Sequence, residues 1–136
     1  EAVEAARTLR EAGFMLLNQT VLLRGVNDDV ETLRTLFREL VYAIGAKPYY
    51  LHHCDLTRGL SHLRTTVDEG LALMQALRGH TSGLCVPEYV LDVPGGGGKV
   101  LLGPTGVVAR EGSAWRLRGY NGVEHDYDEV VRRQEP

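Results

Sequence analysis

Apolar side chains recur along the chain at two spacings, one typical of helices and one typical of strands. Segments with apolar residues three or four positions apart predict amphipathic helices at residues 1–12, 30–44 and 67–77. Between and after them, apolar or aromatic runs predict strands at residues 14–23, 47–53 and 85–92. The first strand is an almost unbroken apolar run, which predicts burial on both faces of a sheet. Because helices and strands alternate, the pattern indicates an α/β fold with a parallel sheet or barrel.

Polar motifs mark the ends of these elements. Asn27–Asp29 supplies an N-cap for the second helix, and Thr66–Glu69 has the spacing of a capping box before the third. Gly45 and Gly79 follow the last apolar residues of the two helices and can end them in the left-handed conformation. The loop at residues 54–64 connects the second strand to the third helix.

The pattern changes after residue 99 to short strands. These are predicted at residues 100–102, 107–110, 114–118 and 123–127, with Asn121-Gly122 as the favoured two-residue hairpin turn. We therefore expect residues 1–99 to form βα units and residues 100–136 to form a short antiparallel extension. Three crossover units are too few to close a barrel, so we expect the C-terminal part of a partial, open (β/α) barrel. Since the sequence opens inside a helical pattern, we expect a fragment of a longer protein.

Composition narrows the class of protein. The 136 residues are 43% hydrophobic and 24% charged with a net charge of −3, which argues against disorder and against a nucleic-acid partner. No apolar stretch reaches the roughly 18–20 residues of a membrane span, so no membrane partner is expected. The two cysteines, Cys54 and Cys85, cannot form a disulfide framework, and we expect a reducing, cytoplasmic location.

The segment from Pro94 to Lys99 contains four consecutive glycines. It does not match a phosphate-binding P-loop, because Val93 occupies the position of the first glycine and Val100 that of the Ser/Thr. A flexible linker remains one alternative. In another, Lys99 forms a Schiff base with an aldehyde cofactor, whose flat ring the glycines allow to approach closely.

Several polar residues lie within or just after predicted strands. Asp55 and Asp92 lie at the strand edge where parallel α/β proteins place their sites, so they could bind a cation or a metal or act as acid and base. The alternative is that each caps a loop. Asn18 and Gln19 interrupt an apolar strand, and one of them is expected to face the mouth of the sheet or a ligand.

His52, His53 and Cys54 raise the question of a metal site. Adjacent strand residues point to opposite faces, so the two histidines cannot share one ion. His52 and Cys54 could do so, but the sequence offers no further pair with ligand spacing, and we predict no metal site in this chain.

Seven segments are similar to the radical S-adenosylmethionine aminomutases of the lysine 2,3-aminomutase family. They are Asn18–Leu23, Gly25–Asp28, Pro48–Tyr50, Cys54–Leu56, His62–Thr65, Leu77–Gly83 and Asp92–Lys99. The resemblance covers nearly all of residues 1–125, and the last two segments are specific to this group.

The resemblance implies a partial radical-SAM barrel and an enzyme that converts L-lysine to β-lysine by 1,2-migration of an amino group. Its cofactors would be pyridoxal 5′-phosphate, S-adenosylmethionine and a 4Fe-4S cluster. Lys99 would carry pyridoxal phosphate as a Schiff base, and Gln19 would contact S-adenosylmethionine. Asp55 and Asp92 would bind the ε-ammonium of lysine, since a desolvated ammonium needs compensating charge.

The resemblance also leaves alternatives open. Two carboxylates suit a guanidinium as well, so the substrate could be another cationic amino acid such as arginine. The family's Cys-x-x-x-Cys-x-x-Cys motif is absent, so we expect the cluster ligands to lie outside this chain and the chain alone to be inactive. A non-catalytic binding or assembly module is the alternative from another class.

The C-terminal tail differs from that of well-known members of the family, in which cysteines bind zinc between subunits. The tail Glu124–Glu129 contains no cysteine, so we expect no zinc site there. For the full-length protein the resemblance implies a homo-oligomer.

Overall fold

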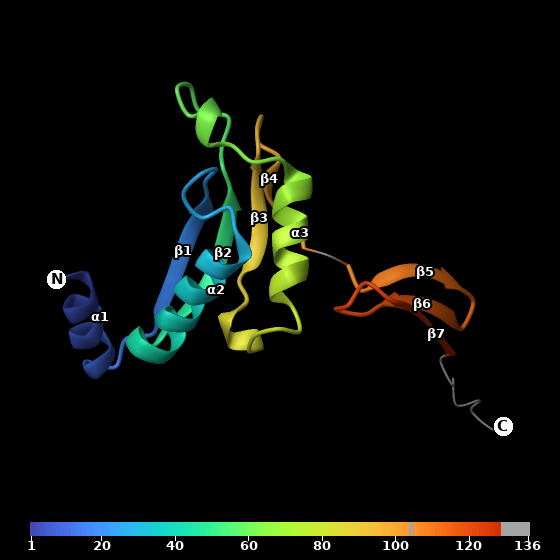
Figure 1. Ribbon diagram of the computed structural model, residues 1–136, viewed down its shortest axis with the longest axis horizontal. Coiled ribbons are helices and arrows are strands. Elements are labelled where there is room, and N and C mark those ends of the chain that lie inside the picture. The colour runs from blue at the N-terminus through green and yellow to red at the C-terminus, as the bar shows by residue number, and fades with distance from the viewer. Residues whose placement is uncertain (104, 129–136) are drawn as a thin grey trace. The chain divides into compact units, whose positions relative to one another are not determined.

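The computed structural model describes residues 1–103 and 105–128 (Figure 1). The chain divides into two compact units, Glu1–Gly103 and Pro104–Pro136, and each is considered by itself. Residues 129–136, which include the end of the expected extension and Glu129 of the cysteine-free tail, lie outside the described residues.

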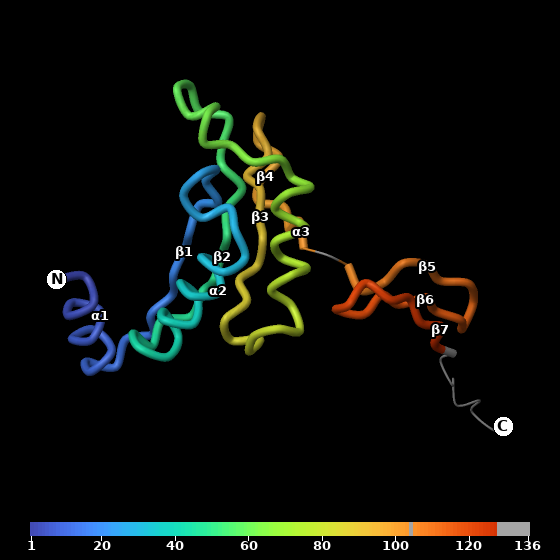
Figure 2. The backbone as a smooth tube through the Cα atoms, viewed as in Figure 1, coloured from blue at the N-terminus to red at the C-terminus, as the bar shows by residue number. Residues whose placement is uncertain are grey.

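The first unit alternates helices and strands, as the sequence predicts. Its main elements are α1 (Ala2–Glu11), β1 (Leu16–Leu22), α2 (Val30–Glu39), β2 (Ala46–His53), α3 (Val67–Leu77), β3 (Glu88–Val93) and β4 (Gly98–Leu101). A single π-helical turn, Leu40–Ile44, continues α2, and short 3₁₀ turns lie at Ser61–Leu63 and Gly83–Cys85. The backbone trace in Figure 2 follows the successive strand–helix–strand passes.

The strands of this unit form one sheet in the order β1-β2-β3-β4. β1, β2 and β3 are parallel, which confirms the predicted crossovers, whereas β4 pairs antiparallel with β3. The sheet is open: the described residues form no closed barrel. Because β4 is a strand of this sheet, residues 98–101 belong to the first unit.

Helices α2 and α3 cover one face of the sheet (Figure 1). The fully buried side chains on this face are Leu22, Leu51 and Tyr89 from the strands and Leu33, Phe37, Met74 and Leu77 from the helices. The prediction that the first strand is buried on both faces is wrong. Along β1, residues alternate between the helix-covered face and an open face on which Leu17 and Val21 are 51% and 43% exposed.

Two predicted caps are confirmed. The side chain of Asp29 accepts a hydrogen bond of 2.9 Å from the Thr32 amide, and Thr66 and Glu69 form the reciprocal bonds of a capping box. The third strand begins at Glu88 rather than at Cys85, because residues 83–85 form a 3₁₀ turn and Pro87 has no amide hydrogen to pair.

Gly70 allows α3 to approach the sheet closely. A Cβ atom at this position would lie 2.0 Å from the hydroxyl of the fully buried Tyr89. We expect Gly70→Ala to lower the free energy of unfolding by about 1–3 kcal/mol through overpacking, although alanine is otherwise favoured in a helix. The shift of the urea denaturation midpoint of the protein measures this effect.

Gly83→Ala is the matched control for this substitution. Within the part of the chain that the structure describes, nothing lies within 4 Å of a Cβ built at Gly83, and its backbone is not in the left-handed region. Its effect should stay within about 0.5 kcal/mol. Tyr89→Phe should restore part of the stability lost in Gly70→Ala, because it removes the nearest of the clashing atoms. Equal stabilities for Gly70→Ala and the wild type would contradict this account of the packing.

The second unit contains a three-stranded antiparallel sheet in the order β5-β6-β7. Its strands are β5 (Val107–Glu111), β6 (Ala114–Arg118) and β7 (Glu124–Asp128). The turn between the last two strands spans residues 119–123, so it is longer than the predicted two-residue turn at Asn121-Gly122; Gly122 has a positive φ of 79°, whereas Asn121 does not. None of the helices within the described parts of the chain combines the length and apolar character needed to cross a membrane.

Candidate functional site

The glycine run forms a tight turn between β3 and β4, with Val93 paired to Gly98. Gly95, Gly96 and Gly98 have φ values of 75°, 86° and 73°, which other residues rarely adopt. A Cβ atom at Gly97 would lie 2.6 Å from Cγ1 of Val93. The flexible-linker alternative is therefore wrong, because three of the glycines adopt a positive φ in this turn and the fourth leaves no room for a side chain.

This turn brings Lys99 directly opposite Asp92. The two residues are register partners in β3 and β4, so their side chains emerge on the same face. Nζ of Lys99 lies 2.8 Å from Oδ1 and 2.7 Å from Oδ2 of Asp92. The hydrogen bonds from Lys99 hold the pKa of the Asp92 carboxyl below its usual value. The side chains are 34% and 46% exposed, so a ligand can reach both.

Four polar side chains form a row across the strands β1, β2, β3 and β4. They are Gln19, His52, Asp92 and Lys99. Nε2 of His52 lies 2.9 Å from Oε1 of Gln19, and its Nδ1 lies 3.4 Å from Oδ2 of Asp92 and 3.5 Å from Nζ of Lys99. We call this set the polar row.

Strand register explains why the polar row lies on one face. His52 is the register partner of Val21 in β1 and of Val90 in β3. Gln19 comes two residues before Val21 and Asp92 two residues after Val90, so these side chains point to the same side as His52. This is the face of the sheet opposite α2 and α3.

A pocket of about 320 Å³ opens at the carboxyl ends of the parallel strands. It is lined by Gln19, Val21, His52, His53, Asp55 and Asp92. The structure therefore brings three of the four candidate residues, Gln19, Asp55 and Asp92, to one pocket. The fourth, Lys99, is hydrogen-bonded to Asp92.

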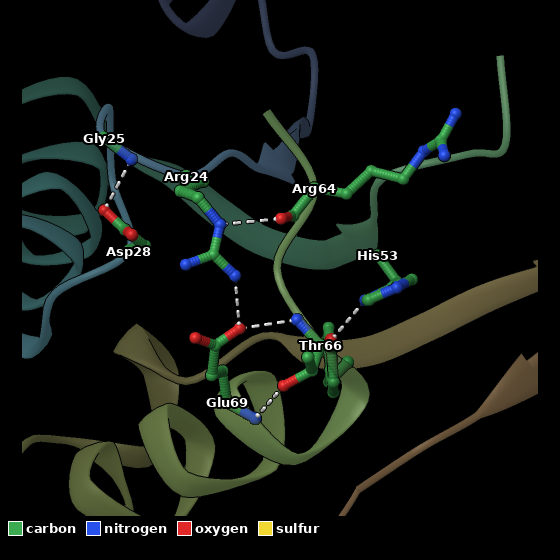
Figure 3. A network of polar contacts seen from close by, with 8 residues as sticks. Arg24, Gly25, Asp28, His53, Arg64, Thr66 and Glu69 are labelled. Atoms are coloured by element: carbon green, nitrogen blue, oxygen red, sulfur yellow. Dashed lines mark hydrogen bonds and ion pairs between the residues drawn. The ribbon is translucent and has the colours of Figure 1, made fainter. Parts of the chain in front are cut away.

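Two arginines hold the loop that carries Asp55. Nε of Arg64 donates to the Asp55 carbonyl at 3.0 Å. Nε of Arg24 donates to the Arg64 carbonyl, and Nη2 of Arg24 donates to Glu69, both at 2.8 Å (Figure 3). These bonds tie the segments after β1 and β2 to the start of α3, and Arg64 holds the backbone of Asp55 directly.

His53 points to the helix-covered side of the sheet, away from His52. Its Nδ1 lies 2.7 Å from the hydroxyl of Tyr89. Burial lowers the pKa of His53 and raises the pKa of Tyr89 to about 12, so the phenol keeps its proton. The prediction that the two adjacent histidines point to opposite faces is confirmed. Within residues 1–103 and 105–128, no group of three or more His, Cys, Asp or Glu could hold a metal ion.

Sequence reasoning considered His52 only as a metal ligand and missed its place in the polar row. The signal was present in the residue spacing. His52 lies three residues before Asp55 in a strand next to that of Gln19, but its contacts depend on a register that the sequence does not state. The register shifts by one residue between Asn18 and Gln19, at a bulge containing Tyr49.

Comparison with known proteins identifies the relatives of this chain. A family model described as Lysine-2,3-aminomutase matches residues 74–134. L-lysine 2,3-aminomutase of Clostridium subterminale is 46% identical over 131 residues, which cover 96% of this chain and 31% of that protein. The chain belongs to the lysine 2,3-aminomutase family. It corresponds to the C-terminal part of these relatives.

Two other relatives carry different names. L-lysine 2,3-aminomutase of Bacillus subtilis is 44% identical over 95% of this chain and 27% of its own length. Glutamate 2,3-aminomutase of Clostridioides difficile is 42% identical over 90% of this chain and 29% of its own length. The chain thus spans about a third of the length of the curated relatives it matches. The identities to the lysine and glutamate aminomutases differ little.

Proposed function

We propose that the full-length protein converts L-lysine to β-lysine by 1,2-migration of an amino group. The reaction would follow a radical mechanism that uses pyridoxal phosphate and S-adenosylmethionine. The observation that carries the proposal is the Lys99–Asp92 pair at the glycine turn. Asp92 lines the neighbouring pocket together with Asp55 and Gln19.

The surroundings of Lys99 suit an aldehyde cofactor with a flat ring. The amine is partly exposed, and its Nζ lies 5.3 Å from the ring centre of Tyr50. Among the described residues, no atom lies within 4 Å of a Cβ built at Gly95 or Gly96, so a ring can approach this side of the turn. We assign Lys99 as the residue that holds pyridoxal phosphate.

The remaining residues of the site bind and orient. Asp55 and Asp92 would hold the ε-ammonium of lysine, and Gln19 would contact S-adenosylmethionine. When bound, these two cofactors supply a conjugated ring that delocalises an unpaired electron and a radical that removes a substrate hydrogen. With Lys99 holding the cofactor, its amine would no longer be an ammonium paired with Asp92, and that carboxylate would be available to the substrate ammonium.

The proposal also covers the rest of the protein. We place the open sheet in a partial radical-SAM barrel, with the 4Fe-4S cluster ligands supplied by sequence outside this chain and a homo-oligomer as the working assembly. Cys54 and Cys85 are both buried and free among the described residues, which supports the reducing, cytoplasmic setting expected from the sequence.

Borohydride trapping tests the assignment of Lys99. The full-length protein is loaded with pyridoxal phosphate, reduced and mapped by peptide mass spectrometry, and we expect the label at Lys99. Within this chain the competing amine is Lys47, whose pKa is lowered by burial. Its Nζ, however, donates to the carbonyls of Leu84 and Val86 at 2.9 Å each. A label at Lys47, or at a lysine outside this chain, would refute the assignment.

Arginine is the second candidate substrate, because the same two carboxylates can bind a guanidinium. Parallel assays with lysine and arginine separate the two. If the protein turns over arginine but not lysine, arginine replaces lysine as the proposed substrate. Binding of neither amino acid and no label at Lys99 would favour the non-catalytic binding or assembly module.

A further inference from the structure

His52 connects the two halves of the candidate site. One ring nitrogen meets Gln19 on β1, and the other meets Asp92 on β3 and Lys99 on β4. The side chain is only 18% exposed, and the ring of Tyr50 packs against it edge-on at 5.7 Å between ring centres. The imidazole is thus held in an orientation that presents each nitrogen to a different partner.

The protonation state of the His52 ring decides whether Nδ1 contacts Lys99 or Asp92. With the amide of Gln19 in this orientation, Oε1 accepts, so Nε2 of His52 carries a hydrogen. In a neutral ring, Nδ1 then accepts from the ammonium of Lys99. In a protonated ring, Nδ1 donates to Oδ2 of Asp92. His52 can therefore stay in contact with this pair whether or not Lys99 occupies the carboxylate.

We propose that His52 is a positioning residue that couples the contact of Gln19 with S-adenosylmethionine to the binding of the substrate ammonium at Asp92. The inference rests on the proposed function, which supplies both ligands. When Lys99 leaves Asp92, the imidazole remains beside Oδ2 and keeps the carboxylate facing the pocket. A ligand that fixes Gln19 also fixes the ring, and through it Asp92. Such coupling is reciprocal, so each ligand raises the affinity for the other by the same factor.

Two substitutions separate the two ends of the ring. In His52→Asn, the side-chain amide reaches about as far as Nδ1 and can still contact Asp92. In His52→Gln, it reaches about as far as Nε2 and can still contact Gln19. The pair therefore breaks the link at opposite ends while each variant retains a polar group.

Calorimetry on the full-length protein measures the coupling. The dissociation constants of S-adenosylmethionine and lysine are determined for each protein, alone and with the other ligand present. In the wild type we expect each ligand to tighten the other about fivefold or more. In both variants this factor should fall to about one. His52→Asn should weaken the binding of S-adenosylmethionine more than that of lysine, and His52→Gln should weaken the binding of lysine more than that of S-adenosylmethionine.

Nuclear magnetic resonance of ¹⁵N-labelled histidine provides a readout without either ligand. We expect Asp92→Asn to shift the Nδ1 resonance of His52 and Gln19→Ala to shift the Nε2 resonance. Three results would each overturn the inference. They are a coupling factor in both variants equal to that of the wild type, equal losses of affinity for the two ligands in both variants, and resonances that do not shift. If the wild type binds neither ligand while the resonances shift as expected, the proposed function fails and the hydrogen-bonded link through His52 is retained.

Discussion

Replacing Lys99 with arginine is expected to abolish turnover by the full-length protein, with a loss on the order of 10³-fold or more. Arginine keeps a positive charge opposite Asp92, where Lys99 now lies 2.7 Å from Oδ2. Its guanidinium, however, cannot form a Schiff base with an aldehyde, because it stays protonated and delocalised. The substitution therefore separates the ionic role of Lys99 from its covalent role. Single-turnover assays and the absorbance of the bound cofactor measure the two effects.

Lys47→Arg is the matched control for this experiment. Nζ of Lys47 donates to the backbone carbonyls of Leu84 and Val86, and Lys47 lies outside the polar row. We expect this variant to retain most of the wild-type turnover and to bind pyridoxal phosphate. Normal turnover by Lys99→Arg would show that the amine of Lys99 is not the point of attachment.

The second large effect is expected from Asp92→Asn, which should weaken lysine binding about 10- to 100-fold, the range of a hydrogen bond to a charged group. The affinity for L-norleucine, which lacks the ε-amine, should change little, because Asp92 would contact only the distal ammonium. Asp55→Asn should show the same discrimination between the two amino acids. Calorimetry with lysine and norleucine on the full-length protein gives the comparison directly.

Asp126→Asn serves as the control carboxylate. Asp126 is paired with Arg116 at 3.3 Å on the second sheet and is 84% exposed, so its loss should leave both affinities unchanged. Unaltered lysine binding in Asp92→Asn and Asp55→Asn would remove the two acids from substrate recognition. Equal losses for lysine and norleucine would indicate a general disturbance of the pocket.

Much of the fold could be predicted because its signals are local. The helical spacing of apolar residues, the cap at Asp29 and the capping box at Thr66 each lie within a few neighbouring residues, and all are confirmed. The parallel order of β1, β2 and β3 follows from the alternation of strands and helices. The structure also brings Asp55 and Asp92 to one pocket, since predicted strand ends meet at one edge of a parallel sheet.

The failures concern partners that are distant in sequence. The apolar character of residues 14–23 does not reveal that α2 and α3 cover only one side of β1, so burial on both faces is a wrong prediction. The antiparallel pairing of β4 with β3 depends on how the glycine turn closes. The role of His52 in the polar row depends on register across three strands, including a bulge that the sequence does not announce.

The glycine turn has one more consequence, for insertions and deletions. Asp92 and Lys99 share a face because they are register partners in the antiparallel pairing of β3 with β4. Sliding one strand past the other by a single residue would send the lysine to the helix side and leave the aspartate where it is. The number of residues in this turn therefore determines which side of the sheet receives the amine, while the glycines allow the turn to close.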